Sequence, residues 1–428
     1  MRVGIAGAVR GAGFIAGLRS DGDRAKIVAV YDPIQSAREE FAKTHEVEFV
    51  CESFDELLDH VDLVILSSPQ QHHTPQAVEA LGRGIHVLSE VPAVVSLEQA
   101  SALVGAVRMS TAKYMMSENY CYTRENLTIK TMARAGEFGE LYYGEGEYLH
   151  EMKSWHTKPT GERTWRYYWQ VGRDGVTYPT HSLGPLLQWF DDRIVSVSCV
   201  GTGRHSDPEH ELQDTTILLA RTLNGRLLRV RFDLLSNRPE LMAYYSLQGT
   251  QGAYEAARTA QSQPVIHLNG RSPANTWEPL DSFVDHFLPE RYREPPEGGG
   301  HWGSDVWPIR DFLDAITEDT TPEVDVYHAL DMTLPGLLSE QSINQGGAWI
   351  HVLNPRYLTS EIGVDPSGKA HSPNTPRSQT AKCCARGTTH RKPPGSRSTG
   401  SCDFWTDSEL HTLRKASMGQ SSGAKVVA

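Results

Sequence analysis

The chain has 428 residues, with 41 lysine and arginine residues against 53 aspartate and glutamate residues, so its formal net charge is −12 at pH 7. This length allows two or three domains with a large buried core. The acidic balance argues against nucleic acid as a partner, because phosphate binding needs a basic surface. No run of about 18 apolar residues occurs, so the sequence predicts neither a membrane-spanning helix nor a membrane partner.

The N-terminal segment and the cysteines indicate the cytoplasm. The apolar run Val3-Gly4-Ile5-Ala6 is too short for a secretory signal and is soon followed by Arg10. The six cysteines show no C-x-x-C spacing, so they predict neither a zinc site nor a disulfide scaffold.

The charge is distributed unevenly along the chain. Residues 355–428 hold eleven basic and five acidic residues, a net charge of +6, which leaves −18 on residues 1–354. The same segment is rich in Ser, Thr, Pro and Gly, a composition that cannot bury enough apolar surface to offset chain entropy. We therefore expect a disordered basic tail over residues 355–428, with a basic interaction arm as the alternative.

Residues 1–122 alternate predicted strands and helices. Apolar strands are predicted at 2–6, 26–31, 63–66, 85–89 and 113–116, and helices at 34–44, 53–58, 75–83 and 97–109. Continuous apolar strands separated by helices are typical of a parallel sheet that is covered on both faces. The pattern predicts an α/β fold for this part, a doubly wound Rossmann domain over residues 1–122.

The pattern changes after Tyr122. A helix is predicted at 127–135, strands at 141–148, 195–200, 215–221, 226–234 and 243–249, and further helices at 306–316 and 327–341. Asn224-Gly225 is a strong signal for a hairpin turn. These elements predict an α+β substrate domain over residues 123–354, built on a largely antiparallel sheet.

A glycine-rich turn follows the first predicted strand, at Gly7-Ala8-Val9-Arg10-Gly11-Ala12-Gly13. Such a turn lets a pyrophosphate approach the backbone N–H groups at the start of a helix. The spacing departs from G-x-G-x-x-G, because Val9 takes the second glycine position while Gly11 and Gly13 straddle the third. An ordinary glycine turn is therefore the alternative.

Asp32 ends the second predicted strand, where a dinucleotide-binding fold places an acid on the adenosine ribose. A carboxylate there repels a 2′-phosphate, so the cofactor is predicted to be NAD and not NADP. The predicted cofactor contacts in this part are Gly7, Val9, Arg10, Gly11 and Asp32. The alternative for Asp32 is an acid at the start of a helix, beside Pro33.

Two longer segments carry a family resemblance. Leu63-Val64-Ile65-Leu66-Ser67-Ser68-Pro69 with His73, and Gly84-Ile85-His86-Val87-Leu88-Ser89-Glu90-Val91-Pro92, resemble the Gfo/Idh/MocA oxidoreductases, named for glucose–fructose oxidoreductase and inositol dehydrogenase. The resemblance covers roughly residues 1 to 350. It implies a Rossmann domain followed by a domain on an open sheet, NAD as cofactor, and a homo-oligomer that packs through this sheet. It also implies that Ser68, Pro69, His73 and Glu90 line the cofactor channel.

One departure from the family concerns proton transfer. The lysine of the family's Glu-Lys-Pro motif is Val91 here, and valine can neither move a proton nor donate a hydrogen bond. Acid–base work must therefore come from other residues, or the reaction differs.

Further segments are similar to one branch of the family, the NAD-dependent glycosidases typified by bacterial α-N-acetylgalactosaminidases. They are Ser117-Glu118-Asn119-Tyr120-Cys121-Tyr122, Glu147-Tyr148-Leu149-His150, Trp165-Arg166 and Tyr178-Pro179-Thr180-His181-Ser182. The similarity implies that the sugar pocket is lined by Glu118, Tyr148, Arg166, Tyr178 and His181. Among these, we expect Glu118, Tyr178 and His181 to be catalytic, and Tyr148 and Arg166 to bind substrate.

The residue types agree with this role. A neutral imidazole can accept the hydroxyl proton when a hydride leaves a carbinol carbon, which assigns His181 as the general base. Tyr178 would hydrogen-bond the developing alkoxide, and the two project from one face if a helix begins after Pro179. The alternative for His181 is a helix cap.

Other features leave two interpretations each. The aromatic residues Trp155, Trp165, Tyr167, Tyr168 and Trp169 stack on sugar rings or pack in a loop or subunit interface. His301, which follows three glycines, lines the pocket from a loop or lies on the surface.

The histidines at 72, 73, 205 and 210 lack the spacing of metal ligands, so no metal is predicted.

The sequence thus predicts an NAD-dependent oxidoreductase that acts on a carbohydrate or related polyol by hydride transfer at a ring hydroxyl. The alternative is a redox-neutral glycosidase that uses transient oxidation and elimination. A non-catalytic sugar or NAD sensor is a third possibility.

Overall fold

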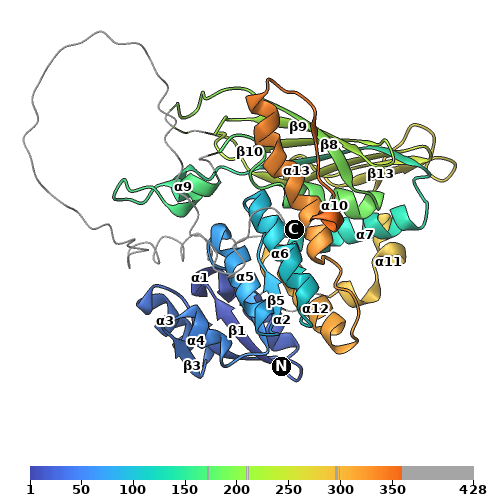
Figure 1. Cartoon of the computed structure of the whole chain (residues 1–428). Helices are drawn as coiled ribbons and strands as arrows, with labels where there is room; N and C mark the ends of the chain where they lie inside the picture. The colour runs from blue at the N-terminus through green and yellow to red at the C-terminus, as the bar shows by residue number, and fades with distance from the viewer. Residues whose placement is uncertain (171–172, 209, 211, 295–296, 298, 359–428) are drawn as a thin grey trace, which may run out of the picture. The chain divides into compact units, whose positions relative to one another are not determined.

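A computed structural model describes residues 1–358 except 171–172, 209, 211, 295–296 and 298 (Figure 1). Of the predicted tail at 355–428, only residues 355–358 are therefore described, and the rest of that prediction lies outside the described residues. No helix within the described ranges combines the length and the apolar character that crossing a membrane requires.

The N-terminal part is a six-stranded parallel sheet with the strand order β3-β2-β1-β4-β5-β6. Its strands are β1 (Arg2–Ala6), β2 (Lys26–Tyr31), β3 (Phe49–Cys51), β4 (Leu63–Leu66), β5 (His86–Ser89) and β6 (Tyr114–Met116). The order reverses between β1 and β4, and in open α/β sheets ligands bind beyond the carboxyl ends of the strands at such a point. This confirms the predicted doubly wound sheet, although the short strand β3 was not predicted.

Helices flank this sheet; α3 to α6 lie within two residues of the predicted bounds, whereas α1 and α2 had no predicted bounds. They are α1 (Ala8–Gly11), α2 (Ile15–Ser20), α3 (Gln35–His45), α4 (Phe54–Leu58), α5 (His73–Gly82) and α6 (Leu97–Met109), with 3-10 turns η1 (Ala12–Phe14) and η2 (Gln70–His72). The Ser53 side chain caps α4 by accepting the N–H of Glu56 at 3.1 Å. The carboxylate of Glu56 accepts the N–H of Glu52 at 2.8 Å, one residue before the cap.

The C-terminal part contains a nine-stranded sheet with the order β14-β13-β12-β11-β7-β10-β9-β8-β15. Its strands are β7 (Leu141–Leu149), β8 (Ile194–Gly201), β9 (Thr216–Thr222), β10 (Leu227–Asp233), β11 (Leu241–Gly249), β12 (Gly252–Glu255), β13 (Val265–Leu268), β14 (Glu278–Pro279) and β15 (Ile350–His351). All neighbouring pairs are antiparallel except β7 with β10. The sheet does not close on itself, which confirms the predicted open, largely antiparallel sheet.

Helices cover one face of this second sheet (Figure 1). They include α10 (Thr180–Phe190) and α13 (Val326–Asn344), which pack on β7 and β8 respectively. Gly144 and Gly146 of β7 allow the close approach of α10, because a Cβ at either position would lie 2.9 Å from Phe190 or from the Ser182 backbone. The remaining helices are α7 (Arg124–Arg134), α8 (Lys153–His156), α9 (Trp165–Trp169), α11 (Asp281–Phe287) and α12 (Trp307–Thr317), with 3-10 turns η3 (Asn119–Tyr122), η4 (Glu290–Tyr292), η5 (His301–Val306) and η6 (Pro355–Tyr357).

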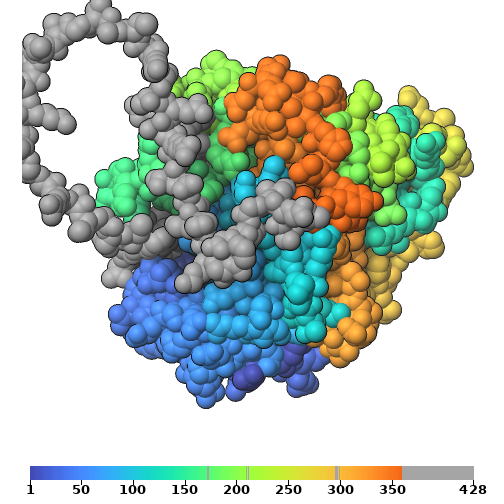
Figure 2. Space-filling view, viewed as in Figure 1, coloured from blue at the N-terminus to red at the C-terminus, as the bar shows by residue number. Residues whose placement is uncertain are grey.

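The chain returns to the first sheet after residue 300. Helix α12 packs on α2 and helix α13 packs on α6, and Figure 2 shows the orange C-terminal residues of the described chain lying against the cyan segment that includes α6. Gly17 permits the contact with α12, since a Cβ there would lie 2.5 Å from Ile309 Cδ1. This return brings η5 next to the glycine-rich turn.

Candidate active site

The glycine-rich turn is built so that a glycine is required at its first position. Gly7 has a φ of 98°, and a Cβ on it would lie 2.5 Å from the carbonyl oxygen of Ser67. Gly11 lies against β1, where a Cβ would come within 2.3 Å of Ile5 Cγ2. Val9 can replace the usual second glycine without a clash inside the protein, because its side chain is exposed. The turn therefore retains the tight bend and the close helix–strand packing of a dinucleotide-binding turn.

Asp32 is tied to this turn from the carboxyl end of β2. Its buried carboxylate accepts the backbone N–H groups of Ala8 at 2.9 Å and Ile34 at 3.0 Å. Burial raises the pKa of Asp32, and these two hydrogen bonds oppose the rise. Each carboxylate oxygen has a second lone pair, so the group can still accept ribose hydroxyls. The turn and the acid thus fit an adenosine dinucleotide, in which the ribose meets Asp32 and the pyrophosphate meets the turn.

His73 connects two loops on the cofactor side of the sheet. Its buried ring lies with Nδ1 3.0 Å from the carbonyl oxygen of Pro92 and Nε2 2.8 Å from that of Ser68. Burial lowers the pKa of His73 although both carbonyl oxygens favour its charged form. The ring therefore holds the loop that carries Ser68 and Pro69 against the loop that carries Glu90. A direct contact of these residues with the cofactor stays a prediction.

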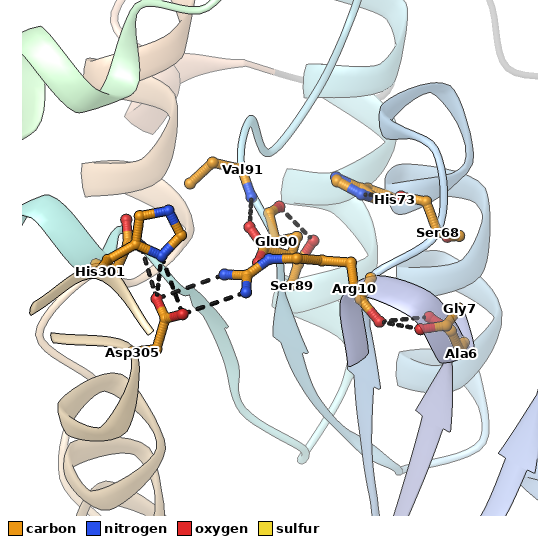
Figure 3. Close-up of polar contacts among 12 residues, drawn as sticks. Ala6, Gly7, Arg10, Ser68, His73, Ser89, Glu90, Val91, His301 and Asp305 are labelled. Atoms are coloured by element: carbon orange, nitrogen blue, oxygen red, sulfur yellow. Dashed lines mark hydrogen bonds and ion pairs between the residues drawn. The ribbon is translucent and has the colours of Figure 1, made fainter. Parts of the chain in front are cut away.

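Arg10 links the turn to the C-terminal part of the chain, as Figure 3 shows. Its Nε lies 2.6 Å from Glu90 Oε1, and its Nη1 lies 3.2 Å from Asp305 Oδ2. Asp305 also accepts from Asn119 Nδ2 at 2.6 Å and lies 3.0 Å from His301 Nδ1. Burial disfavours the guanidinium charge, but the two carboxylates outweigh burial and raise the pKa of Arg10.

This network locates two features of the sequence. His301 belongs to the edge of the site, since its ring faces Asp305 from η5 and lies 6.2 Å from the ring of Tyr120. Val91, which replaces the family's lysine, is buried, and its backbone N–H donates to Glu90 Oε2 at 3.1 Å. The network thus holds two carboxylates and a histidine beside the position that lacks the lysine.

Glu118 and His181 form a second group in the site, a buried pair. His181 Nδ1 lies 2.7 Å from Glu118 Oε1, which also accepts the backbone N–H of Tyr120 at 3.1 Å. The Tyr120 ring stacks on the imidazole with 3.9 Å between centroids. The backbone carbonyl of His181 accepts the hydroxyl of Tyr245. No described residue bonds to Nε2, so this nitrogen is left to accept a proton.

Two tyrosines face this histidine. The Tyr178 ring meets the His181 ring edge-on at 4.9 Å, and the Tyr148 ring lies 5.3 Å from it. Helix α10 begins at Thr180, after Tyr178, so Tyr178 precedes the helix, although the two rings still meet as predicted. Burial raises the pKa of both tyrosines, helped at Tyr178 by the charge of Glu90. Both phenols are therefore hydrogen-bond donors near neutral pH.

Arg166 reaches the same region from α9. Its guanidinium lies over the rings of Trp155 and Trp165, at 5.1 and 4.4 Å from their centroids, and donates to Gln170 Oε1 at 3.2 Å. Two members of the aromatic-rich stretch thus hold a charged side chain. Burial lowers the pKa of Arg166, while Tyr178 and Tyr148 act in the opposite direction. The group stays charged, because a guanidinium does not deprotonate in proteins.

A separate group of potential metal ligands lies on the first sheet. Among the described residues, Cys51, Glu56 and His60 form the one set whose ligand atoms all lie within 4.8 Å of one another. Burial raises the pKa of the Cys51 thiol to about 11, so it is a thiol and not a thiolate. Among the described residues, no hydrogen bond or ion pair joins this group to the active site.

Comparisons with known proteins give one family match for each of the two parts of the chain that form this site. Residues 1–118 match a family model described as the oxidoreductase family with an NAD-binding Rossmann fold, and residues 122–355 match one described as the C-terminal domain of glycosyl hydrolase 109. The N-terminal part is therefore an NAD-binding Rossmann domain. The chain belongs to glycosyl hydrolase family 109.

Curated relatives support this placement, and solved structures support the fold. A glycosyl hydrolase family 109 protein of Shewanella putrefaciens is 32% identical over 340 residues, which cover 70% of this chain and 73% of the relative. An alpha-N-acetylgalactosaminidase of Shewanella oneidensis is 30% identical over 337 residues, which cover 70% and 73%. A levoglucosan dehydrogenase in complex with NADH and L-sorbose superposes with a TM-score of 0.71 at 16% identity, over 83% of this chain and 99% of that structure. An inositol dehydrogenase homolog of Azotobacter vinelandii, with NADH and myo-inositol, gives 0.67 at 18% identity, over 82% and 97%.

Proposed function

We propose that this protein uses NAD to transfer a hydride at a ring hydroxyl of a carbohydrate, and that the outcome is cleavage of a glycosidic bond without net oxidation. The observation that carries the hydride step is the buried Glu118–His181 pair, which leaves one imidazole nitrogen free between two tyrosines. The family membership of the C-terminal domain favours the glycosidase outcome.

The residues of the site divide the first step between them. NAD, when bound, accepts a hydride from a carbinol carbon and can return it later. As the hydride leaves, His181 Nε2 accepts the hydroxyl proton, and the imidazolium is stabilised by the carboxylate of Glu118 at Nδ1. Tyr178 donates a hydrogen bond to the oxygen that becomes a carbonyl. Arg166 supplies a fixed positive charge that can bind a polar ring substituent.

The second step follows from the carbonyl. A C–H bond next to a carbonyl group is acidic, so loss of that proton can expel the glycosidic oxygen, which takes up a proton from water as it leaves. Water then adds to the unsaturated ring, and the hydride returns to the carbon it left. Electrons and atoms balance as a hydrolysis, and the cofactor ends in its original oxidation state.

The test uses chromogenic nitrophenyl glycosides with the purified protein and NAD. We expect nitrophenol release that depends on NAD, without accumulation of NADH. His181→Ala should lower the turnover number about 10²–10⁴-fold, the usual loss when a general base is removed, while NAD still binds. His286→Ala, at an exposed histidine of α11, is the matched control and should behave as the parent.

Three other outcomes would change the conclusion. NADH that accumulates in step with sugar consumption would identify a dehydrogenase. Binding of NAD and sugar without any turnover would identify a sensor. A His181→Ala variant within a few-fold of the parent would mean that the histidine only packs within α10 and is not the base.

A further inference from the structure

A second chain of polar contacts leads away from the site through Tyr148. The Tyr148 hydroxyl lies 3.0 Å from His150 Nδ1, and His150 Nε2 lies 2.9 Å from Glu240 Oε1. Tyr148 is buried, whereas the side chain of Glu240 is 41% exposed. The three residues therefore connect the interior of the site to solvent by two consecutive hydrogen bonds.

The sheet positions these three residues. Tyr148 is in β7, and His150 lies two residues after Tyr148, just beyond the end of the strand, so both side chains point to the same face of the sheet. Strand β11 pairs with β7 through Leu241 and Leu149, which places Glu240 next to His150. The backbone N–H of His150 donates to the Asp233 carbonyl oxygen at 2.9 Å and so holds the chain beyond β7 in place.

The surroundings of His150 favour one tautomer. Burial and the charge of Arg166 of α9 lower the pKa of His150 to about 4, and the rings of His181 of α10 and His301 of η5 add to this effect when they carry a proton. The ring is therefore neutral near pH 7 and carries one N–H. Its Nε2 faces a carboxylate, which can only accept, so Nε2 holds the hydrogen and Nδ1 accepts from the Tyr148 hydroxyl.

Glu240 is suited to take up a proton from this side. Burial and the charge of Glu151 raise the pKa of Glu240, so it accepts a proton more readily than an ordinary exposed glutamate. The Glu118–His181 pair offers no such exit, because both side chains are buried. A proton that leaves the sugar ring on the Tyr148 side thus has a path to solvent that the other pair lacks.

We infer that Tyr148, His150 and Glu240 form a proton relay that serves the elimination step, with His150 and Glu240 as positioning residues that act through Tyr148. The inference rests on the proposed function. As the C–H bond next to the carbonyl breaks, its electron pair forms the ring double bond and the glycosidic oxygen departs. The proton passes to the Tyr148 oxygen, the phenolic proton passes to His150 Nδ1, and the Nε2 proton passes to Glu240. The reverse sequence returns a proton when water adds.

The relay explains how a tyrosine can serve as a base here. Burial raises the pKa of Tyr148, so the phenolate is scarce at neutral pH. A phenol that passes its own proton to His150 while it accepts another never has to become a free phenolate. Tyr178, by contrast, has no described residue bonded to its hydroxyl that could take its proton away.

The experiment compares His150→Gln and Glu240→Gln with Glu290→Gln, which removes the same charge from an exposed position on η4. We expect kcat for glycoside cleavage to fall about 100-fold in His150→Gln and about 10-fold in Glu240→Gln, within the range of general acid–base effects, with KM and NAD affinity near the parent values. Transient NADH should still form in the first turnover, because hydride transfer precedes the relay. The pH profile of Glu240→Gln should lose the ionisation that Glu240 contributes to kcat, and added imidazole should restore part of the rate of a His150→Gly variant.

Two kinds of result would overturn the relay. The first concerns activity: Glu240→Gln behaves as Glu290→Gln does, or His150→Gln loses hydride transfer and cleavage equally. The second does not depend on activity: NMR of isotope-labelled histidine, assigned by difference with His150→Gln, must show a neutral His150 protonated at Nε2 near pH 7. A protein without any turnover would refute the proposed function, whereas a charged His150 or one protonated at Nδ1 would refute the relay alone.

Discussion

Replacing Glu118 by glutamine separates the charge of this residue from its shape. The side chain is completely buried, and its Oε1 lies 2.7 Å from His181 Nδ1 and 3.1 Å from the N–H of Tyr120. A glutamine has the same size, and its amide oxygen can accept both hydrogen bonds. Only the negative charge that favours an imidazolium over a neutral ring is lost.

The size of the effect follows from that difference. A hydrogen bond to a charged group contributes roughly 1.5–3 kcal/mol and a neutral one roughly 0.5–1.5 kcal/mol, so the transition state loses about 1–2 kcal/mol. Since about 1.4 kcal/mol corresponds to a factor of ten, Glu118→Gln should lower kcat about 5- to 30-fold. Glu118→Ala leaves the N–H groups of His181 and Tyr120 buried without this acceptor, which costs roughly 1–3 kcal/mol of unfolding free energy for each.

The assay measures kcat and KM with a nitrophenyl glycoside, NAD affinity by titration, and the free energy of unfolding in urea. Glu118→Gln should retain NAD affinity and lose at most about 1–2 kcal/mol of stability, because its amide NH₂ takes the position of Oε2, a buried oxygen without a described hydrogen-bond partner. A kcat within about twofold of the parent would refute the assignment of His181 as a base that Glu118 assists. A loss of NAD binding as large as the loss of kcat would refute it as well.

Three further predictions concern the cofactor side. Asp32→Ala should narrow the preference for NAD over NADP in paired titrations, because it removes the charge that repels a 2′-phosphate, and a parent protein that binds both equally would contradict this. Gly7→Ala should cost more than about 1 kcal/mol of unfolding free energy and weaken NAD binding, because Gly7 has a φ of 98° and an added Cβ would meet the Ser67 carbonyl. The control is Gly105→Ala, where an added Cβ meets open space. Burial would raise the pKa of Asp305, but Arg10 and His301 outweigh it and lower the pKa. The stability that this carboxylate contributes is therefore present above its unfolded pKa of about 3.9 and is lost as the pH falls through the lower folded value. The unfolding free energies of the parent and Asp305→Asn should thus converge only below about pH 4. An unchanged difference between them at lower pH would contradict the ion pairs.

Local pattern was sufficient for most of the fold. Most of the longer strands and helices have enough residues for their apolar periodicity to identify them, although β12 and β13 were not predicted and a helix after Pro179 was only a condition. The Asn224-Gly225 turn joins β9 and β10 as predicted. Strand β3 has three residues, and the edge strands β14 and β15 have two each, which is too short for any periodicity. These strands exist because a neighbouring strand supplies their hydrogen bonds, and the sequence does not record that partner.

The residues of the site likewise divide into those that were predicted from the sequence and those that were not. Glu118, Tyr148, Tyr178 and His181 were predicted from motifs, and the structure brings them together. Asp305 was not predicted, because it meets Arg10 only through the return of η5 to the first sheet, almost 300 residues along the chain.

Glu240 was missed for a related reason. Its contact with His150 depends on the register of β11 against β7, which no local pattern contains. A histidine two residues after a site tyrosine was the one available signal, since strand alternation places both on one face.

The most direct test of redox-neutral glycoside cleavage is to run the reaction in deuterium oxide with catalytic NAD and to analyse the released sugar by mass spectrometry and NMR. Transient oxidation followed by elimination predicts a sugar that carries solvent deuterium at the ring carbon next to the anomeric carbon, formed over many turnovers for each NAD. A sugar released without deuterium on any ring carbon, or formed equally well without NAD, would contradict the account.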